Sequence, residues 1–374
     1  MSDTRQFNFT VAAAGVATWR QGELFEWREI PGTNMAPAMD HVTNGFLSYS
    51  GGALHPTTNK YYIAGGGHAD DWSNAIYSLD LTLASPVWVR ESGPTPLAQM
   101  WGTSVQGFPY VYDGRPASRH TWNGTCQVIP TWGTQGRVLL VGAQAVWGNG
   151  NGSFTNLDAW DIAAKDYTWI NPAPLTSPYG PNPTLPPIPN GRTAACAVRD
   201  TTLGHVWALS TAQGSTAPYY RFNVTSQTWD LTVAQGWSEE RRILGYDSNR
   251  ARIVAFPGST GTNRFTYFNA DGTGLATANN TTGLLFSDGA VIFEPTLDRF
   301  VYHPYITGSD SVYLIHPTTF AVAMQATTGS KLAASNSFGI GVNPPHSRFC
   351  YVPDYKGVIL FNNVNATVRF MRLA

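Results

Sequence analysis

A repeated strand-turn-strand pattern is the feature of this 374-residue chain that most constrains its fold. Each copy has a polar turn and then an apolar strand: HPTTNKYYIAG (55–65), IPTWGTQGRVLLVG (129–142), RDTTLGHVWAL (199–209), YDSNRARIVAF (246–256), EPTLDRFVYH (294–303) and NPPHSRFCYV (343–352). The apolar strands start at Tyr61, Val138, Val206, Ile253, Phe300 and Phe349, and the last four starts are 47, 47 and 49 residues apart. A fixed spacing of this size indicates a repeat architecture.

A further apolar strand follows each copy, and we interpret the pair as the second and third strands of one repeat unit. These third strands are 74–81, 157–162, 219–224, 264–271, 311–317 and 357–363. They run for five to seven residues between clusters of Gly, Pro, Asn and Asp, which is the pattern of β-strands, and no amphipathic helix is evident. About four short strands per unit predict an all-β fold, a β-propeller with four-stranded blades; six blades are favoured and seven are possible.

The first repeat unit resembles a kelch repeat. Its stretch YYIAGGGHADDWSNAIYSLDL (61–81) has a glycine run after the second strand and an aromatic residue in the third, and Trp88 follows in the expected fourth strand. The resemblance is partial in the second and third units, and the later units lack the glycine pair. It implies a kelch-like propeller, related in fold to galactose-oxidase-type propellers, but names no activity, because propellers serve many functions.

The chain divides into an N-terminal arm with a ring-closing strand (1–40) and the propeller (41–374). Residues 24–33 (LFEWREIPGT) resemble the end of the first unit (88–96), so we interpret them as an outer strand that closes the ring, or as the remnant of a seventh blade. Residues 6–16 are expected to be tied down on the ring or on a neighbouring subunit.

Charge and cysteine content exclude several classes of function. Charged residues are 13% of the chain and the formal net charge is −1, which argues against nucleic-acid binding through a basic face and against a polybasic membrane anchor. No apolar run is long enough for a transmembrane helix, and no secretory signal is expected. Cys126, Cys196 and Cys350 do not have metal-site spacing and are expected to be buried free thiols.

In a propeller, the loops after each second strand and the connections between blades meet on one face. These segments include 65–74, 142–156, 303–310, 353–357, 99–124 and 171–192, and the first two units carry the longest ones. Long loops of this kind are usually functional. The candidate ligand-binding residues on them are His68, Asp70, Asp71, Trp72, Arg119, His120, Trp122, Trp147, Arg192 and Tyr305.

Aromatic rings with Asp, Asn and Arg around them suit a sugar, whose C–H face packs on the ring while its hydroxyls form hydrogen bonds. Each candidate also has a structural interpretation: His68 can bond a neighbouring blade, and the adjacent carboxylates of Asp70 and Asp71 suit a turn better than a calcium site. Arg119 and His120 precede a first strand, where the chain passes into the central region.

We therefore expect a non-enzymatic recognition or structural propeller that contacts a glycan or a partner protein. The surface composition resembles that of bacteriophage and bacterial surface-assembly proteins with kelch-like propellers, which implies a virion or extracellular location, or a cytoplasmic one if neither holds. The N-terminal arm is a possible contact to an assembly partner. No metal and no cofactor are expected.

Two enzymatic alternatives remain open. Some propeller lyases that cut uronate polysaccharides resemble this architecture, and His68, His120, Tyr305, Arg119 and Arg192 have the residue types for proton abstraction and carboxylate neutralisation. Galactose-oxidase-like copper enzymes carry a Tyr-His pair and a Tyr-Cys link, and this chain contains Tyr302-His303 and Cys126.

Overall fold

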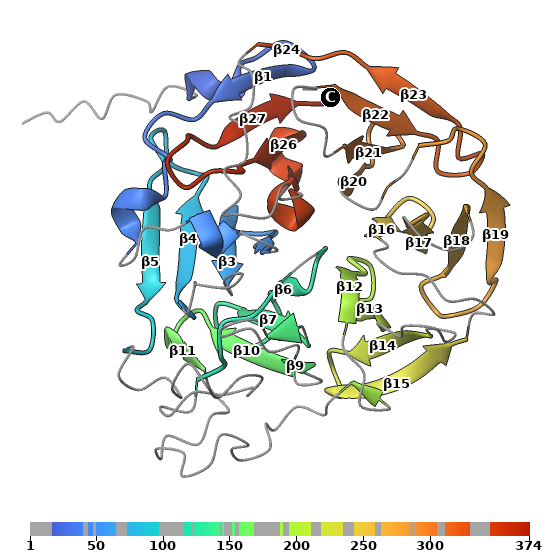
Figure 1. The fold of residues 1–374 in the computed structure, drawn as a ribbon, viewed down its shortest axis with the longest axis horizontal. Helices are drawn as coiled ribbons and strands as arrows, with labels where there is room; N and C mark the ends of the chain where they lie inside the picture. Colours follow the sequence, from blue (N-terminus) through green and yellow to red (C-terminus); the bar gives the residue numbers. More distant parts are fainter. Residues whose placement is uncertain are drawn as a thin grey trace, which may run out of the picture.

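A computed structural model of the chain shows six β-sheets arranged as a closed ring around a central axis (Figure 1). The structure describes residues 17–39, 44–47, 50–64, 73–96, 115–121, 123–142, 144–145, 152–153, 157–167, 188–189, 194–210, 218–234, 243–258, 263–284, 286, 289–304, 311–329 and 345–374. The expected all-β, six-bladed propeller is confirmed, and the helical segments in the described ranges are single 3₁₀ turns.

Five blades are four-stranded antiparallel sheets whose strands follow chain order from the axis outward. The first comprises β2 (Gly52–Leu54), β3 (Lys60–Ala64), β4 (Ile76–Asp80) and β5 (Trp88–Ser92). The second comprises β6 (Cys126–Ile129), β7 (Arg137–Val141), β10 (Leu157–Asp161) and β11 (Asp166–Tyr167). The third comprises β12 (Ala194–Arg199), β13 (Val206–Ser210), β14 (Tyr219–Asn223) and β15 (Thr228–Val233). The fourth comprises β16 (Ile243–Asp247), β17 (Arg252–Phe256), β18 (Arg264–Asn269) and β19 (Ala276–Asn279). The fifth comprises β20 (Ala290–Glu294), β21 (Arg299–His303), β22 (Val312–Ile315) and β23 (Val322–Gln325).

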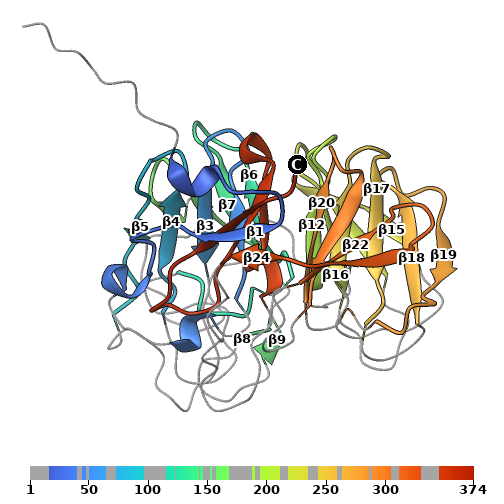
Figure 2. The ribbon, with the colours of Figure 1, turned by 90° about the horizontal axis from the view of Figure 1, so that it is seen from above.

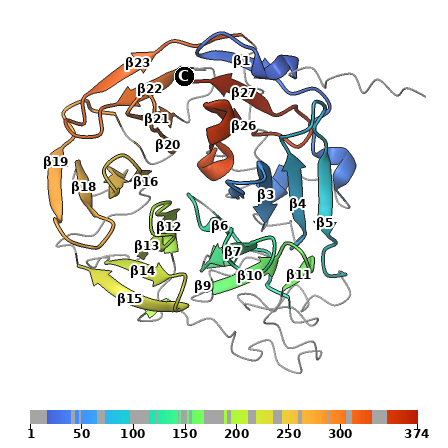
Figure 3. The ribbon, with the colours of Figure 1, turned by 180° about the vertical axis from the view of Figure 1, so that it is seen from behind.

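The sixth blade joins the two ends of the described chain. Its order from the axis is β25 (Cys350–Val352), β26 (Gly357–Leu360), β27 (Arg369–Arg372), β1 (Glu26–Glu29) and the two-residue β24 (Thr328–Gly329). Trp27 of β1 lies opposite Met371 of β27 in antiparallel register, and β24 pairs with β1 in parallel. Figures 1 and 3 show β1 outside β27 at the rim, so an N-terminal strand closes the ring.

This pairing corrects the strand order predicted for the last unit. Phe349 does not start a second strand; it precedes β25, the innermost strand, and residues 357–363 contain the second strand rather than the third. The segment 353–357 is therefore the turn between the first two strands and includes the 3₁₀ turn η7 (Pro353–Tyr355). It lies on the face opposite the one predicted, because successive antiparallel strands turn at alternate ends of a blade.

The remaining short elements lie outside the blades. They are the 3₁₀ turns η1 (Thr18–Arg20), η2 (Ala36–Ala38), η3 (Asn44–Leu47) and η6 (His346–Arg348), and the hairpin of β8 (Gln144–Ala145) and β9 (Gly152–Ser153). Figure 2 shows β8 and β9 beyond one end of the blades, which places the loop between β7 and β10 on that face. No helix in the described ranges has the length and apolar character needed to cross a bilayer.

The recurring turn sequence has a specific local chemistry. Asp200 accepts hydrogen bonds from the backbone N–H groups of Thr202 (2.7 Å) and Leu203 (3.1 Å), and Asp247 accepts them from the corresponding turn residues of the next blade. In the first blade the Nδ1 atom of His55 takes the same place, 3.3 Å from the N–H of Thr57. Such side-chain acceptors stabilise turns, and this explains why the motif recurs as HPTT, RDTT and YDSN.

One residue at the end of each of these turns has a positive φ, in all six blades. They are Asn59 (51°), Gly136 (83°), Gly204 (81°), Ala251 (48°), Asp298 (54°) and Lys356 (45°). The left-handed conformation is strained for residues with a Cβ atom. A shared backbone requirement is thus met by different residues, which is one reason that the sequence repeat looks irregular.

Two substitutions at this position are expected to act in opposite directions. A Cβ on Gly136 would lie 3.0 Å from Nε2 of His55 and 3.1 Å from the carbonyl oxygen of Ile129, so Gly136→Ala should lower the free energy of unfolding by about 1–2 kcal/mol. Lys356 is exposed, and Lys356→Gly removes strain while adding unfolded-state entropy, so it should be neutral or stabilising by up to about 1 kcal/mol. Urea unfolding measures both changes in the free energy of unfolding. An equal loss of stability in the two variants would contradict a left-handed conformation shared by the two turns.

The hydrophobic core is divided among the blade interfaces. Within the described ranges, six clusters of buried side chains each join two neighbouring blades; one, for example, packs Tyr61 and Trp88 of the first blade against Phe361 and Phe370 of the sixth. Because each sheet buries both faces against its neighbours, the strands are apolar on both sides, as the sequence runs predicted. Cys126 and Cys196 are buried, Cys350 is partly buried, and all three thiols are free.

Candidate functional site

Most of the predicted ligand-binding residues lie outside the described part of the chain. Of the ten, the structure places Arg119 and His120. The other eight, about whose geometry nothing is stated, are His68, Asp70, Asp71, Trp72, Trp122, Trp147, Arg192 and Tyr305.

Arg119 lies in the segment that connects the first two blades, and its side chain is buried against the second blade. Its Nη2 atom lies 2.8 Å from a carboxylate oxygen of Asp158 in β10, and both side chains are 0% exposed. Buried charges are tolerated when they are paired in this way. The guanidinium is therefore committed to a carboxylate inside the fold and does not reach the surface.

His120 is also buried, 4% exposed, in the segment that connects the first two blades. The neighbouring Thr121 Oγ1 accepts the N–H of Gly51 (3.0 Å) and donates to the carbonyl of Ala64 (2.9 Å), both in the first blade. Residues 119–121 thus fasten one blade to the next. They precede a first strand, as the sequence indicated, but the sequence did not show that they are enclosed.

Tyr302 and His303, the pair that raised the copper-oxidase alternative, are consecutive residues of β21 and lie on opposite faces of its sheet. Tyr302 packs on Phe286, with ring centroids 4.7 Å apart, in the cluster between the fourth and fifth blades. His303 contacts Trp27 and Phe349 of the sixth blade, and burial lowers its pKa to about 4. Cys126 belongs to a third cluster, between the first two blades. Within the described ranges, no group of three or more His, Cys, Asp or Glu could hold a metal.

A cavity of about 770 Å³ occupies the centre of the ring and is lined by the innermost strands of all six blades. The residues after these strands also line it: Pro56, Pro130, Thr201, Ser248, Pro295 and Pro353. Because these turns connect the first and second strands, the cavity extends to the face opposite the long loops. Its volume is in the range of small-molecule sites in proteins.

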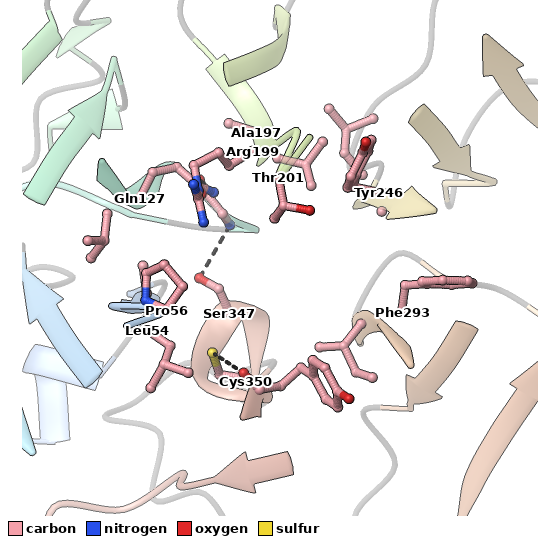
Figure 4. Close-up of a pocket in the computed structure, with 18 of the residues that line it drawn as sticks. Leu54, Pro56, Gln127, Ala197, Arg199, Thr201, Tyr246, Phe293, Ser347 and Cys350 are labelled. Atoms are coloured by element: carbon pink, nitrogen blue, oxygen red, sulfur yellow. Dashed lines mark hydrogen bonds between the residues drawn. The ribbon is translucent and has the colours of Figure 1, made fainter. Parts of the chain in front are cut away.

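Hydrogen bonds also join the second and sixth blades, which lie on either side of the first blade, next to the cavity. The Nδ1–H of His346 donates to Oδ1 of Asn123 (2.9 Å), and the N–H of Gly124 is 3.3 Å from Oγ of Ser347 (Figure 4). Burial, together with the positive charge of Arg348, holds the pKa of His346 well below its usual range, so this imidazole is neutral at pH 7. Two blades that are not adjacent in the ring are therefore fixed to each other at this end.

Six equivalent positions form a ring of side chains around the cavity. Each is the residue of the innermost strand that lies opposite the start of the second strand, as Arg199 lies opposite Val206. The six are Leu54, Val128, Arg199, Tyr246, Phe293 and Tyr351, and all line the cavity. Five are neutral; Arg199 is the exception. Figure 4 shows four of them arranged around the opening.

The walls of the cavity combine apolar surface with neutral polar groups. Leu203 is 53% exposed beside the turn of the third blade, and Ile292 adds apolar surface from the fifth. The hydroxyl groups of Tyr246 and Thr202 are 2.5 Å apart, and burial raises the pKa of Tyr246 to about 12. The amide of Gln127 contributes a further polar group and donates to the carbonyl of Gly124 (2.6 Å).

Sequence reasoning missed this cavity because it selected long loops rather than repeat positions. Arg199 is visible in the sequence as the only charged residue at a position that otherwise holds Leu, Val, Phe or Tyr. Aligning the six turn motifs by the residue before the turn would have found it. That alignment also required the correct strand order in the last unit, where Tyr351 is the equivalent residue.

Comparison with known proteins supplies no family. No known protein family matches the sequence, and no curated protein does. Among solved structures the chain is similar to one described as "Structure of YjhT", with 10% sequence identity and a TM-score of 0.49 over 86% of this chain and 92% of that one. The likeness lies in the propeller fold.

Proposed function

We propose that this protein is a non-enzymatic recognition propeller that binds a glycan, with the ligand seated in the central cavity. The observation that carries the proposal is that all six blades contribute rigid turns and inner strands to one cavity of about 770 Å³. A site built from paired strands and from turns held by side-chain hydrogen bonds is already organised before binding. This reduces the conformational entropy lost when a ligand binds. The glycan site that the sequence analysis expected on the face with the long loops is thus proposed to lie at the other end of the central axis.

The composition of the cavity wall supports a saccharide. Hydroxyl groups of Thr201, Ser248 and Tyr246 and the amide of Gln127 can donate to and accept from sugar hydroxyls. Apolar side chains such as Leu203 and Phe293 offer surfaces for C–H faces. The low charge of the chain, 13% charged residues, supports the further proposal that the protein works on the surface of a virion or cell.

The ionisation of the cavity residues supports binding without catalysis. General acid-base catalysis works best with a group whose pKa lies near the operating pH. Burial raises the pKa of the Cys126 and Cys350 thiols and of Tyr246 to about 12, and His346 stays neutral because its pKa is lowered. These described groups therefore keep one protonation state through neutral pH.

Glycan-array binding followed by mass spectrometry of the eluted saccharide tests the proposal. We expect the purified chain to retain one class of saccharide and to release it with unchanged mass. Thr201→Trp, which fills the cavity at the turn of the third blade, should abolish binding, whereas Thr277→Trp on the exposed outer strand β19 should not. Depolymerised saccharide would exclude the non-enzymatic function, and normal binding by Thr201→Trp would exclude the cavity as the site.

A further inference from the structure

One cation dominates the electrostatics of the central cavity. Among the described residues that line it, Arg199 is the only side chain with a formal charge at pH 7, and no carboxylate lines it. The guanidinium comes from the end of β12, and Figure 4 shows it on the same side of the cavity as Gln127 of β6. The cavity therefore has a net positive charge at one defined place.

The Arg199 side chain is partly buried and makes no hydrogen bond or ion pair with another described residue. Its pKa is lowered because burial removes water from the guanidinium, and the charge of Asp200 opposes this only in part. In this respect it differs from two other buried arginines: Arg119 is paired with Asp158, and Arg348 donates to the carbonyls of Phe361 and Ser50. A cation with reduced hydration and no partner favours a bound anion.

The titratable neighbours of Arg199 do not bind its guanidinium. Asp200, the next residue, is 0% exposed and directs one oxygen to the turn N–H groups of Thr202 and Leu203. Its carboxylate also interacts with Tyr246 of the fourth blade. Among the described residues, His55 also interacts with Arg199. The pKa of His55 is lowered, mainly by burial and also by Arg199, so it adds no positive charge at neutral pH.

We propose that the saccharide bound in the cavity carries a carboxylate, as a uronic acid does, and that Arg199 binds this group. The proposal deepens the proposed function and rests on it. A guanidinium matches a carboxylate with two parallel N–H···O bonds, a geometry that an ammonium group does not offer. The surrounding hydroxyl and amide groups face the sugar hydroxyls, and the apolar wall faces its C–H groups. The carboxylate is therefore the only part of the ligand whose binding depends on Arg199.

Isothermal titration with oligogalacturonate and its methyl ester tests the role of Arg199. The two probes have nearly the same shape and differ in charge. The wild-type protein should bind the acid about 10- to 100-fold more tightly than the ester, because hydrogen bonds to charged groups contribute more than neutral ones. Arg199→Gln should remove this preference while leaving ester binding within about threefold, and Arg199→Lys should restore only part of it.

Arg264→Gln, at an exposed arginine of β18, is the matched control and should leave the preference unchanged. Equal binding of acid and ester by the wild-type protein, with no effect of Arg199→Gln, would overturn the carboxylate proposal and leave glycan recognition standing. A parallel loss of acid and ester binding in Arg199→Gln would also overturn it, since that shows damage to the cavity rather than loss of a charge contact. Binding of neither probe, or of a poly-glutamate peptide in their place, would reject the uronate class.

Discussion

Replacing Arg119 by methionine is expected to lower the free energy of unfolding by about 3–5 kcal/mol. The change leaves the Asp158 carboxylate, 0% exposed, without the guanidinium that now lies 2.8 Å away. An unpaired charge in the interior is far more destabilising than the lost contact itself, because the carboxylate cannot regain water. Urea unfolding followed by tryptophan fluorescence measures the effect.

Two further variants separate this effect from a general sensitivity to arginine replacement. Arg119→Met combined with Asp158→Leu removes both charges and should recover most of the lost stability. Arg28→Met breaks a more exposed pair with Glu26, at 3.0 Å, and should change stability by no more than about 1 kcal/mol. A double variant as unstable as Arg119→Met alone would contradict the account. Loss of a binding or catalytic activity in Arg119→Ala would thus report on folding first.

Replacing Trp27 by alanine is expected to lower the free energy of unfolding by about 3–5 kcal/mol as well. Trp27 is 1% exposed and lies in β1, between the fifth and sixth blades, where it contacts His303 with ring centroids 6.1 Å apart. Removing the indole empties a cavity at the point where the N-terminal strand holds the ring closed. The unfolding midpoint in urea should fall accordingly.

Trp229→Ala provides the comparison, because Trp229 is only partly buried on the outer strand β15. Its loss should be clearly smaller, since less of the ring is removed from water. Equal destabilisation of the two variants would contradict the view that β1 stabilises the protein by closing the ring. Limited proteolysis gives an independent measure: Trp27→Ala should expose the sixth blade to cleavage, and Trp229→Ala should not.

The propeller was predictable because its signal is local. Turn residues such as Asp200 and Asp247 accept backbone N–H groups two and three residues ahead, so their spacing is written directly into the sequence. The last unit was misread for the same reason. Its strands were aligned by their spacing from the unit before, whereas its fourth strand from the axis, β1, comes from the N-terminal segment that was expected to close the ring.

The ring follows from local sequence alone, because apolar runs of strand length and recurring turns specify blades that must stack to bury both faces. Which arginine is available to a ligand depends on the packing of the blades. Arg119 precedes the innermost strand of the second blade and Arg199 ends that of the third, yet Arg119 is buried against Asp158 and Arg199 lines the central cavity. The difference depends on what strands distant in sequence place beside each guanidinium, because solvation and charge pairing are set by surroundings in space rather than by neighbours along the chain.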